Sequence, residues 1–324
     1  MRAIHCTAYG DPKDLIVAEI AEPSPEPGDA VVAVEAVGLG FVDGLHVRGG
    51  YQVKRPLPFV PGSEIAGRIV AVGPAVRPDL VGQRVMALAE RGGLAERALV
   101  TAEQCIPLPD GISAVAAASS VVNYSTGIYG LETCGRVQPG ETVLVLGASG
   151  GVGMAAIDIA KGMGATVVAA ASSADKLAAC RARGADLLVD YSGPEWRRAL
   201  EQVLAGRRLD VVYDPVGDRW SETAFRCLAP GGRHLVVGFA GGDIPRIPLN
   251  LPLLKRASIV GVDWGGHVRA DKGAARPLFE RLLELAGQGL ISPEPSATYP
   301  LEEAPSVIER LLGRANIGKP VIVM

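Results

Sequence analysis

Four glycines between residues 147 and 153 carry the clearest chemical signal in this sequence. Gly147 ends a short run of branched apolar residues, and Gly150, Gly151 and Gly153 lie where an apolar stretch with helical spacing begins. A strand, a glycine-rich turn and a helix in this order let backbone N–H groups and the positive end of the helix approach phosphate oxygens. Glycines also mark ordinary turns, but this coincidence favours a dinucleotide pyrophosphate site.

The next strand bears on which dinucleotide this would be. We predict a strand over Thr166–Ala171, and no acidic residue ends it to hold a ribose 2′-hydroxyl; Ser172, Ser173 and then Lys176 follow instead. Hydroxyls and an ammonium group would accept a 2′-phosphate, whereas a carboxylate would repel it. This favours NADPH. Alternatively, Ser173 and Asp175 cap a helix and Lys176 is a solvated helix residue.

Composition limits the class of protein. The chain has 324 residues, 48% of them hydrophobic, and a net charge of −3, so no global basic field would attract nucleic acid or anionic lipid. Its five cysteines form no C-x-x-C pair, which indicates reduced thiols rather than a zinc ribbon or a disulfide framework. No apolar run could cross a bilayer and no signal-peptide core is present, so we expect a cytoplasmic protein without a membrane partner.

The sequence pattern changes once along the chain. Up to about Val121, short strand-like runs alternate with glycine and proline turns, which indicates a β-rich barrel or sandwich. From Thr142 onward strands and helices alternate, as in a doubly wound parallel sheet. The six predicted strands are Thr142–Gly147, Thr166–Ala171, Leu187–Asp190, Asp210–Tyr213, Arg233–Val237 and Ile259–Val262. The predicted helices are Val152–Met163, Ala174–Arg183, Pro194–Ala205, Trp220–Cys227, Ala275–Gln288 and Glu302–Arg314.

Several phrases along nearly the whole chain resemble one family. The run Val60–Gly67 is similar to the P-G-x-E-x-x-G signature of the medium-chain dehydrogenase/reductase superfamily. Gly49-Gly50-Tyr51, the glycine turn and Asp214–Gly217 resemble its zinc-independent quinone oxidoreductase branch, the zeta-crystallin-like group. This resemblance implies an α/β fold, with a Rossmann domain over residues 123–264. A β-rich GroES-like barrel domain over residues 1–122 and 265–324 would hold the substrate.

The resemblance also provides a test for a metal. Zinc alcohol dehydrogenases of this superfamily carry metal ligands at positions that here correspond to Gly40, Ser63 and Val122. Because none of these side chains is a usual zinc ligand, we predict no metal. Many members of the branch have a polar asparagine in place of Gly40, near the reacting oxygen. Trp264 could line the enlarged pocket instead, or could pack in the core.

Site residues follow from the glycine turn and from the resemblance. The predicted cofactor contacts are Thr126, Gly147, Ser149, Gly150, Gly151, Val152, Gly153, Ser172, Ser173, Lys176, Tyr191, Gly238, Phe239 and Arg314. Tyr51 resembles a tyrosine of the substrate pocket and is the one tentative catalytic residue. Each has a structural alternative: a loop aromatic for Tyr51, a helix cap for Thr126, a strand end for Tyr191 and a solvated cation for Arg314.

The resulting hypothesis is hydride transfer from NADPH to a quinone or similar small conjugated acceptor, without a metal. We expect the cleft between the two modules, at the carboxyl ends of the parallel strands. A reductase of enone carbon–carbon double bonds is a second interpretation. A nucleotide- or RNA-binding relative without catalysis is a third, although the intact glycine turn and the net charge argue against it. The resemblance further implies a homodimer, paired through the strand Ile259–Val262.

Overall fold

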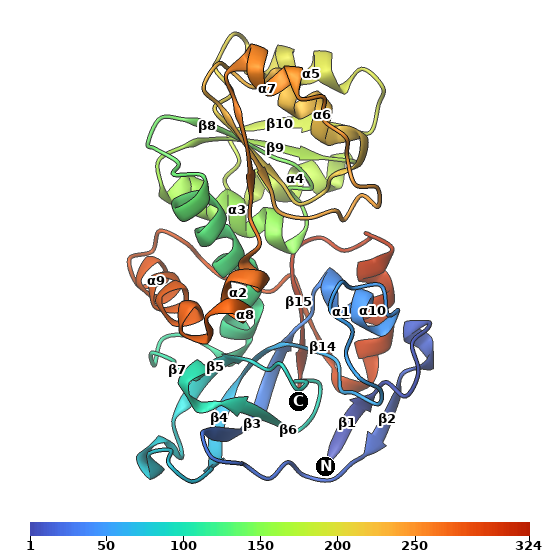
Figure 1. The fold of residues 1–324 in the computed structure, drawn as a ribbon, viewed down its shortest axis with the longest axis vertical. Coiled ribbons are helices and arrows are strands. Elements are labelled where there is room, and N and C mark those ends of the chain that lie inside the picture. Colours follow the sequence, from blue (N-terminus) through green and yellow to red (C-terminus); the bar gives the residue numbers. More distant parts are fainter. The chain divides into compact units, whose positions relative to one another are not determined.

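Two compact units make up the chain (Figure 1). The computed structural model describes residues 1–324 except for the side chain of Lys272. The first unit comprises Met1–Val122, Lys272–Glu280 and Pro293–Met324, and the second comprises Asn123–Asp271 and Arg281–Ser292. Two helices, α2 (Ala114–Ile128) and α9 (Ala275–Gly287), each contribute to both units.

The first unit is built on a mainly antiparallel sheet. Its seven strands are ordered β14-β15-β3-β4-β5-β7, with β6 paired to β3, and β1 and β2 form a separate ribbon. The strand bounds are β1 Arg2–His5, β2 Ile16–Glu19, β3 Asp29–Gly38, β4 Glu64–Val72, β5 Arg84–Leu88, β6 Arg97–Thr101, β7 Ile106–Pro107, β14 Ala297–Pro300 and β15 Pro320–Val323. Two helices, α1 (Phe41–Val47) and α10 (Ala304–Leu312), pack against each other.

The second unit contains the predicted parallel sheet. Its six strands are ordered β10-β9-β8-β11-β12-β13, and each pairs parallel with its neighbour. The bounds are β8 Thr142–Val145, β9 Thr166–Ala171, β10 Leu187–Asp190, β11 Val211–Asp214, β12 Arg233–Val236 and β13 Ser258–Gly261. All residues of β8 and β11 are buried, as the continuous apolar runs predict for strands covered on both faces.

Helices cover both faces of this sheet. Figure 1 shows α3 and α4 on one side and α5, α6 and α7 on the other. Their bounds are α3 Gly151–Gly162, α4 Ala174–Ala182, α5 Trp196–Leu204, α6 Asp218–Cys227 and α7 Asn250–Lys255, followed by α8 Trp264–Ala270. Gly164 and Gly184 follow α3 and α4 with φ of +78° and +105°, so both take the left-handed conformation expected just beyond a helix end.

The segment 265–324 is divided differently from the sequence-based assignment. That assignment placed all of 265–324 with the first module, whereas 265–271 and 281–292 belong to the second unit. The contacts explain the difference: the His267 ring stacks on Tyr129 with centroids 4.7 Å apart, and Arg281 pairs with Glu132 at 3.1 Å. These long-range contacts join residues whose local sequence carries no signal of domain membership.

Candidate functional site

The turn after β8 brings two stretches of backbone very close together. Gly147 has φ of +57°, Gly150 is the N-cap residue of α3, and the Gly150 N–H donates to the Gly147 carbonyl. A Cβ built on Gly153 would lie 2.5 Å from Gly147 O and 2.6 Å from Ala148 Cα, so this position requires glycine. At Gly150 the nearest atom would be 3.4 Å away. The first turn of α3 therefore presents its N–H groups beside a surface free of side chains, which suits a phosphate.

A buried carboxylate shapes the turn after β11. Asp214 Oδ1 accepts hydrogen bonds from the N–H groups of Val216 and Gly217, at 2.9 and 2.8 Å. Its Oδ2 accepts from the Ser221 hydroxyl and faces His234 Nε2 at 3.0 Å. Burial alone would raise the pKa of Asp214, but the hydrogen bonds from His234, Ser221 and Gly217 hold it below its ordinary value. The carboxylate therefore stays ionised and fixes this turn.

Three turns pack together at the carboxyl edge of the sheet. A Cβ on Gly147 would lie 2.7 Å from Val216 Cγ2, and one on Gly217 would lie 2.8 Å from the Phe239 ring. Gly238 N–H donates to the Asp214 carbonyl at 3.3 Å. The structure thus brings the predicted residues Gly238 and Phe239 next to the turn that carries Gly147, through the D-P-V-G turn between them.

Three of the predicted cofactor contacts, Ser172, Ser173 and Lys176, lie close together after β9, and one of them caps a helix. Ser173 is the N-cap of α4, and its hydroxyl accepts from Lys176 N–H at 3.4 Å. Lys176 Nζ lies 3.4 Å from the Ser172 hydroxyl. After β10, the Tyr191 ring packs on Trp220 with centroids 5.1 Å apart. In the cap the Ser173 oxygen accepts a hydrogen bond, whereas a phosphate would accept one from its O–H, so capping does not exclude ligand contact.

Thr126 lies inside α2, so the alternative that it caps a helix is wrong. A buried polar network holds this end of the helix: the Tyr124 hydroxyl donates to Asp158 Oδ2 at 2.6 Å, and Arg183 donates to the same oxygen at 2.7 Å. Thr126 and Ser149 are both nearly buried within the second unit. Trp264, which begins α8, is also buried, and its indole N–H has no partner among the described residues.

Tyr51 and Arg314 are the two predicted site residues that belong to the first unit. The Tyr51 ring packs against His46, with centroids 4.6 Å apart. Arg314 follows α10 in the left-handed conformation, with φ of +56°. Tyr51 therefore packs against a histidine of α1.

A buried ion pair lies beside two of the three positions compared with zinc ligands. Lys319 Nζ pairs with Glu64 Oε1, and both side chains are about 95% buried, with exposed fractions of 5% and 4%. A Cβ on Gly40 would lie 3.4 Å from Lys319 Nζ. Val122 N–H donates to the other Glu64 oxygen at 2.8 Å. An ammonium and a carboxylate therefore lie next to Gly40 and Val122.

The third position, Ser63, contacts a second cation. Arg55 Nη2 donates to the Ser63 hydroxyl at 2.9 Å. Burial, together with the positive charge of Arg55, lowers the pKa of His46 to about 4, so that this histidine is neutral at pH 7. Asp43 is buried and accepts from Gly40 N–H at 2.8 Å. Among the described residues, no three His, Cys, Asp or Glu side chains form a group that could hold a metal ion.

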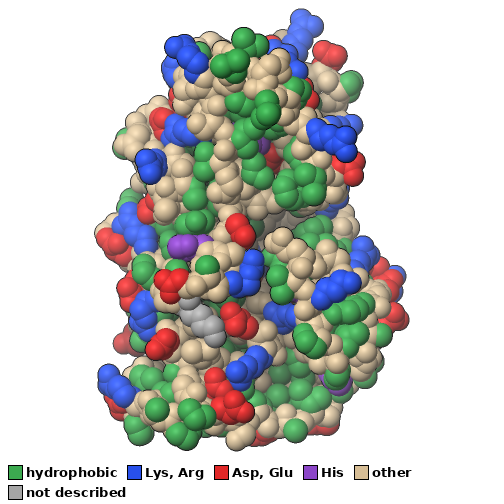
Figure 2. Space-filling model, in the orientation of Figure 1, with side chains coloured by type: hydrophobic (Ala, Val, Ile, Leu, Met, Phe, Trp, Pro, Cys, Tyr) green, Lys and Arg blue, Asp and Glu red, His purple; other side chains and the backbone are tan. Residues whose placement is uncertain are grey.

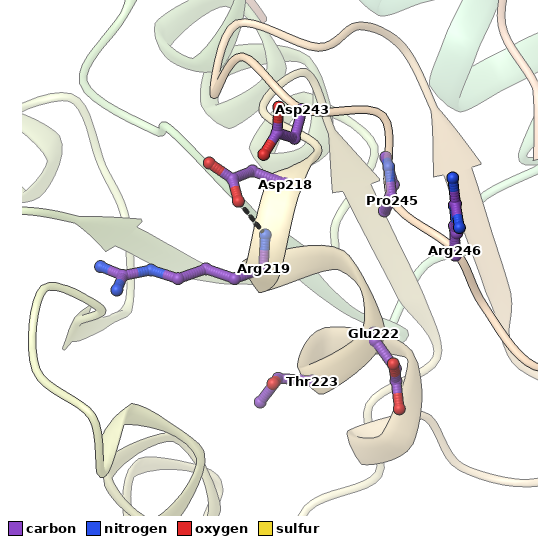
Figure 3. A pocket seen from close by; sticks show the side chains of 7 residues that line it. All are labelled: Asp218, Arg219, Glu222, Thr223, Asp243, Pro245 and Arg246. Carbon is purple, nitrogen blue, oxygen red and sulfur yellow. Dashed lines mark hydrogen bonds between the residues drawn. The ribbon is translucent and has the colours of Figure 1, made fainter.

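A separate pocket opens in the second unit at the start of α6. Figure 3 shows its lining side chains, with the carboxylates of Asp218 and Asp243 near each other and the Arg219 side chain extending away from them. Asp218 has φ of +55° and accepts from the Arg219 N–H. None of the predicted cofactor contacts lines this pocket. Across the part of the chain that is described, no helix has the length and apolar character needed to span a membrane.

Comparison with known proteins identifies the family. Residues 26–110 match the family described as alcohol dehydrogenase GroES-like domain, and residues 151–281 match the zinc-binding dehydrogenase family. The chain is 34% identical to the quinone oxidoreductase-like protein 2 homolog of Nematostella vectensis, over 99% of this chain and 88% of that protein. The chain belongs to the medium-chain dehydrogenase/reductase superfamily. Within it, the chain falls in the quinone oxidoreductase branch and is therefore an oxidoreductase.

Solved structures of this superfamily share the fold over the full length. A probable oxidoreductase from Mycobacterium abscessus is 35% identical with a TM-score of 0.89, and covers 100% of this chain and 99% of its own. Escherichia coli quinone oxidoreductase, solved in complex with NADPH, is 26% identical with a TM-score of 0.90, and both chains are covered completely. The predicted fold, a six-stranded doubly wound domain plus a GroES-like domain, is confirmed.

Two charged residues of the first unit were missed by sequence reasoning. Arg55 was passed over in a proline-rich loop, and Lys319 in the glycine-lysine-proline phrase near the chain end. Neither has a motif of its own. The signal that could have found them is the loss of metal-binding side chains at Gly40 and Ser63, because a site that loses a divalent cation can recover positive charge from Lys or Arg.

Gly153 and Gly150 provide a matched pair of variants that tests the close approach at the turn. We expect Gly153→Ala to lower the free energy of unfolding by about 1–3 kcal/mol, because its methyl group must push backbone atoms apart. Gly150→Ala should change the free energy by less than about 1 kcal/mol, since its Cβ meets only one atom at ordinary contact distance. Urea unfolding measures both, and equal losses would contradict the geometry.

Proposed function

We propose that this protein is an NADPH-dependent, zinc-independent reductase of quinones or similar conjugated acceptors. The observation that carries the proposal is the glycine turn at α3, where a Cβ would collide with backbone at Gly153 yet the face at Gly150 is open. This is a cradle for a dinucleotide pyrophosphate at a helix N-terminus. We further propose that the second unit holds the cofactor and that the first unit supplies contacts to the acceptor.

The coenzyme preference rests on the residues that follow β9. Ser172, Ser173 and Lys176 present two hydroxyls and an ammonium group within one short segment. β9 itself ends without a carboxylate, and the one acidic residue of the segment, Asp175, lies in the first turn of α4. The two hydroxyls and the ammonium group suit a 2′-phosphate and give no acidic partner to a free ribose hydroxyl. Tyr191 and Arg314 complete the proposed 2′-phosphate and adenosine contacts, and Thr126, Gly238 and Phe239 are proposed to contact the nicotinamide. A complex of a 26% identical relative with NADPH supports this choice.

The case for a zinc-independent reaction rests on the side chains at the three compared positions. Gly40 and Val122 offer no ligand atom, and the Ser63 hydroxyl already accepts a hydrogen bond from Arg55. Beside Gly40, the Lys319 ammonium pairs with Glu64 and so occupies the buried carboxylate that a metal ion could otherwise bind. When bound, the nicotinamide supplies a hydride. The protein then has to align the acceptor and exclude water, a task in which Tyr51 is proposed to contact the acceptor.

Quinones fit this arrangement because their reduced oxygens take protons from solvent. The experiment is a panel of quinones, enones and simple alcohols, in which NADPH oxidation or NADP⁺ reduction is followed with the purified protein. We expect quinones to be reduced with NADPH. Reduction of enones alone would identify a reductase of carbon–carbon double bonds, and oxidation of simple alcohols alone would contradict the proposal.

The proposed 2′-phosphate contacts predict a selective defect. We expect Lys176→Ala and Arg314→Ala each to raise the KM for NADPH about tenfold, because each loses a charge-assisted hydrogen bond of roughly 1.5–3 kcal/mol. The KM for NADH should change little, since NADH lacks the phosphate. Steady-state kinetics with both coenzymes check this, and equal effects on the two would reject a role in phosphate binding.

We also propose a homodimer formed through the edge of the parallel sheet. β13 is the last strand of the sheet and pairs only with β12 among the described residues. Next to it in sequence, Leu249, Leu253 and Leu254 expose 83%, 76% and 73% of their area. Figure 2 shows hydrophobic side chains gathered at the end of the molecule where Figure 1 places α7. An open edge beside apolar side chains favours pairing with a second copy.

The dimer predicts a specific effect of charge on α7. Sedimentation of the wild-type protein at micromolar concentration should give a dimer, and Leu253→Asp should give a monomer, because a carboxylate would be buried at the interface. Val81→Asp is the control, since Val81 is also exposed, at 47%, but lies in the other unit. A monomeric wild type, or a dimer that survives in Leu253→Asp, would contradict this interface.

A further inference from the structure

Two cations of the first unit lie beside the positions that carry zinc ligands in other members of the superfamily. Lys319 lies next to Gly40, and the Arg55 guanidinium donates a hydrogen bond to the Ser63 hydroxyl. Both act on the buried Asp43: burial raises the pKa of this carboxyl, and the charges of Lys319 and Arg55 oppose the rise. Two cations and two buried carboxylates, Asp43 and Glu64, therefore lie together where relatives place a metal.

The two cations differ in what they can still bind. Lys319 Nζ is paired with Glu64, and only 5% of its side chain is exposed, so its ammonium group is not accessible to a ligand. Arg55 is only partly buried. Its guanidinium donates two hydrogen bonds, to the Ser63 hydroxyl at 2.9 Å and to the Val60 carbonyl at 3.4 Å. A guanidinium has five N–H donors, so donors of Arg55 remain for a ligand.

The neighbours of Arg55 match a planar, uncharged acceptor. Its guanidinium lies 5.9 Å from the centroid of the Phe59 ring. The charge of Arg55 also acts on His46, whose ring packs against that of Tyr51. His46 is neutral at pH 7, so Arg55 is the charged group that acts on the histidine against which Tyr51 packs. Aromatic rings with one fixed donor suit a flat ring that bears an oxygen.

We propose that Arg55 is the residue that hydrogen-bonds the acceptor oxygen and stabilises the negative charge that develops on it. This inference rests on the proposed reductase function and names the group that replaces the metal as the source of positive charge. The Ser63 hydroxyl, at the position of a zinc ligand, holds the guanidinium in place. Arg55 is thus a specificity-determining residue for acceptors whose oxygen gains electron density.

The chemistry balances without a proton from Arg55. The acceptor gains a hydride, that is, two electrons and one proton, and its oxygen becomes an oxyanion that takes a second proton from water. NADPH is the electron source and leaves as NADP⁺. Burial lowers the pKa of Arg55, and the charges of Asp43 and Glu90 oppose this shift. Because a guanidinium is not deprotonated in proteins, Arg55 stays charged throughout and contributes only a preorganised donor. A lysine would offer a point charge without the planar fork.

The test compares Arg55 with its neighbour Lys54, which is exposed and has no partner among the described residues. Removing one such donor costs about a hundredfold or more in kcat in other enzymes. We expect Arg55→Met to lower kcat for quinone reduction by about a hundredfold, and the Kd for NADPH, measured by calorimetry, to stay within about twofold of the wild type. Lys54→Met should retain the wild-type kcat.

A second variant separates chemistry from loop structure. Methylguanidinium, added at millimolar concentration, should restore part of the activity of Arg55→Ala, which a purely structural role of the side chain would not allow. If Arg55→Ala does not fold, Arg55→Lys and Arg55→Gln take its place, and kcat should be clearly higher for the lysine. An inactive wild type overturns the proposed function itself. An active wild type whose kcat is unchanged in Arg55→Met, or equal in the lysine and glutamine variants, overturns this inference alone.

Discussion

The close contact between the first turn of α3 and the backbone after β8 is the constraint on which the second unit depends. Gly153 allows the helix to lie against Gly147 and Ala148, at distances that a Cβ would make impossible. This contact directs the N-terminus of α3 at the carboxyl edge of the sheet. The neighbouring turn, fixed by the Asp214 carboxylate, then packs against Gly147 through Val216. The helix N-terminus, the glycine backbone and the neighbouring turns therefore meet at one place on this edge of the sheet.

In the first unit, we propose that positively charged side chains lie where relatives bind a metal. The Lys319–Glu64 pair lies beside Gly40 and Val122, and it is nearly fully buried. A buried ion pair contributes little net stability, because desolvation offsets the attraction, but it fixes the position of its groups. Arg55, by contrast, keeps donors available at its partly buried site. One cation is therefore structural, and the other is open to a ligand.

Local patterns predicted what depends on local sequence. The strand Thr166–Ala171 was predicted to the residue, and the strand predicted over Ile259–Val262 does lie at the edge of the sheet. What failed depends on contacts between distant residues. Segment 281–292 joins the second unit through pairs such as Arg281 with Glu132, 149 residues apart. Lys319 forms an ion pair with Glu64, 255 residues away in the sequence, so no local spacing could have predicted that pair.

One measurement tests the central claim, that hydride passes from NADPH to a conjugated acceptor without a metal. The purified protein is treated with a strong chelator, its zinc content is measured, and the oxidation of NADPH by an excess of quinone is then followed anaerobically. We predict an unchanged turnover rate in the zinc-free protein and no increase when zinc is added. Loss of turnover on chelation, restored by one equivalent of zinc, would contradict the account.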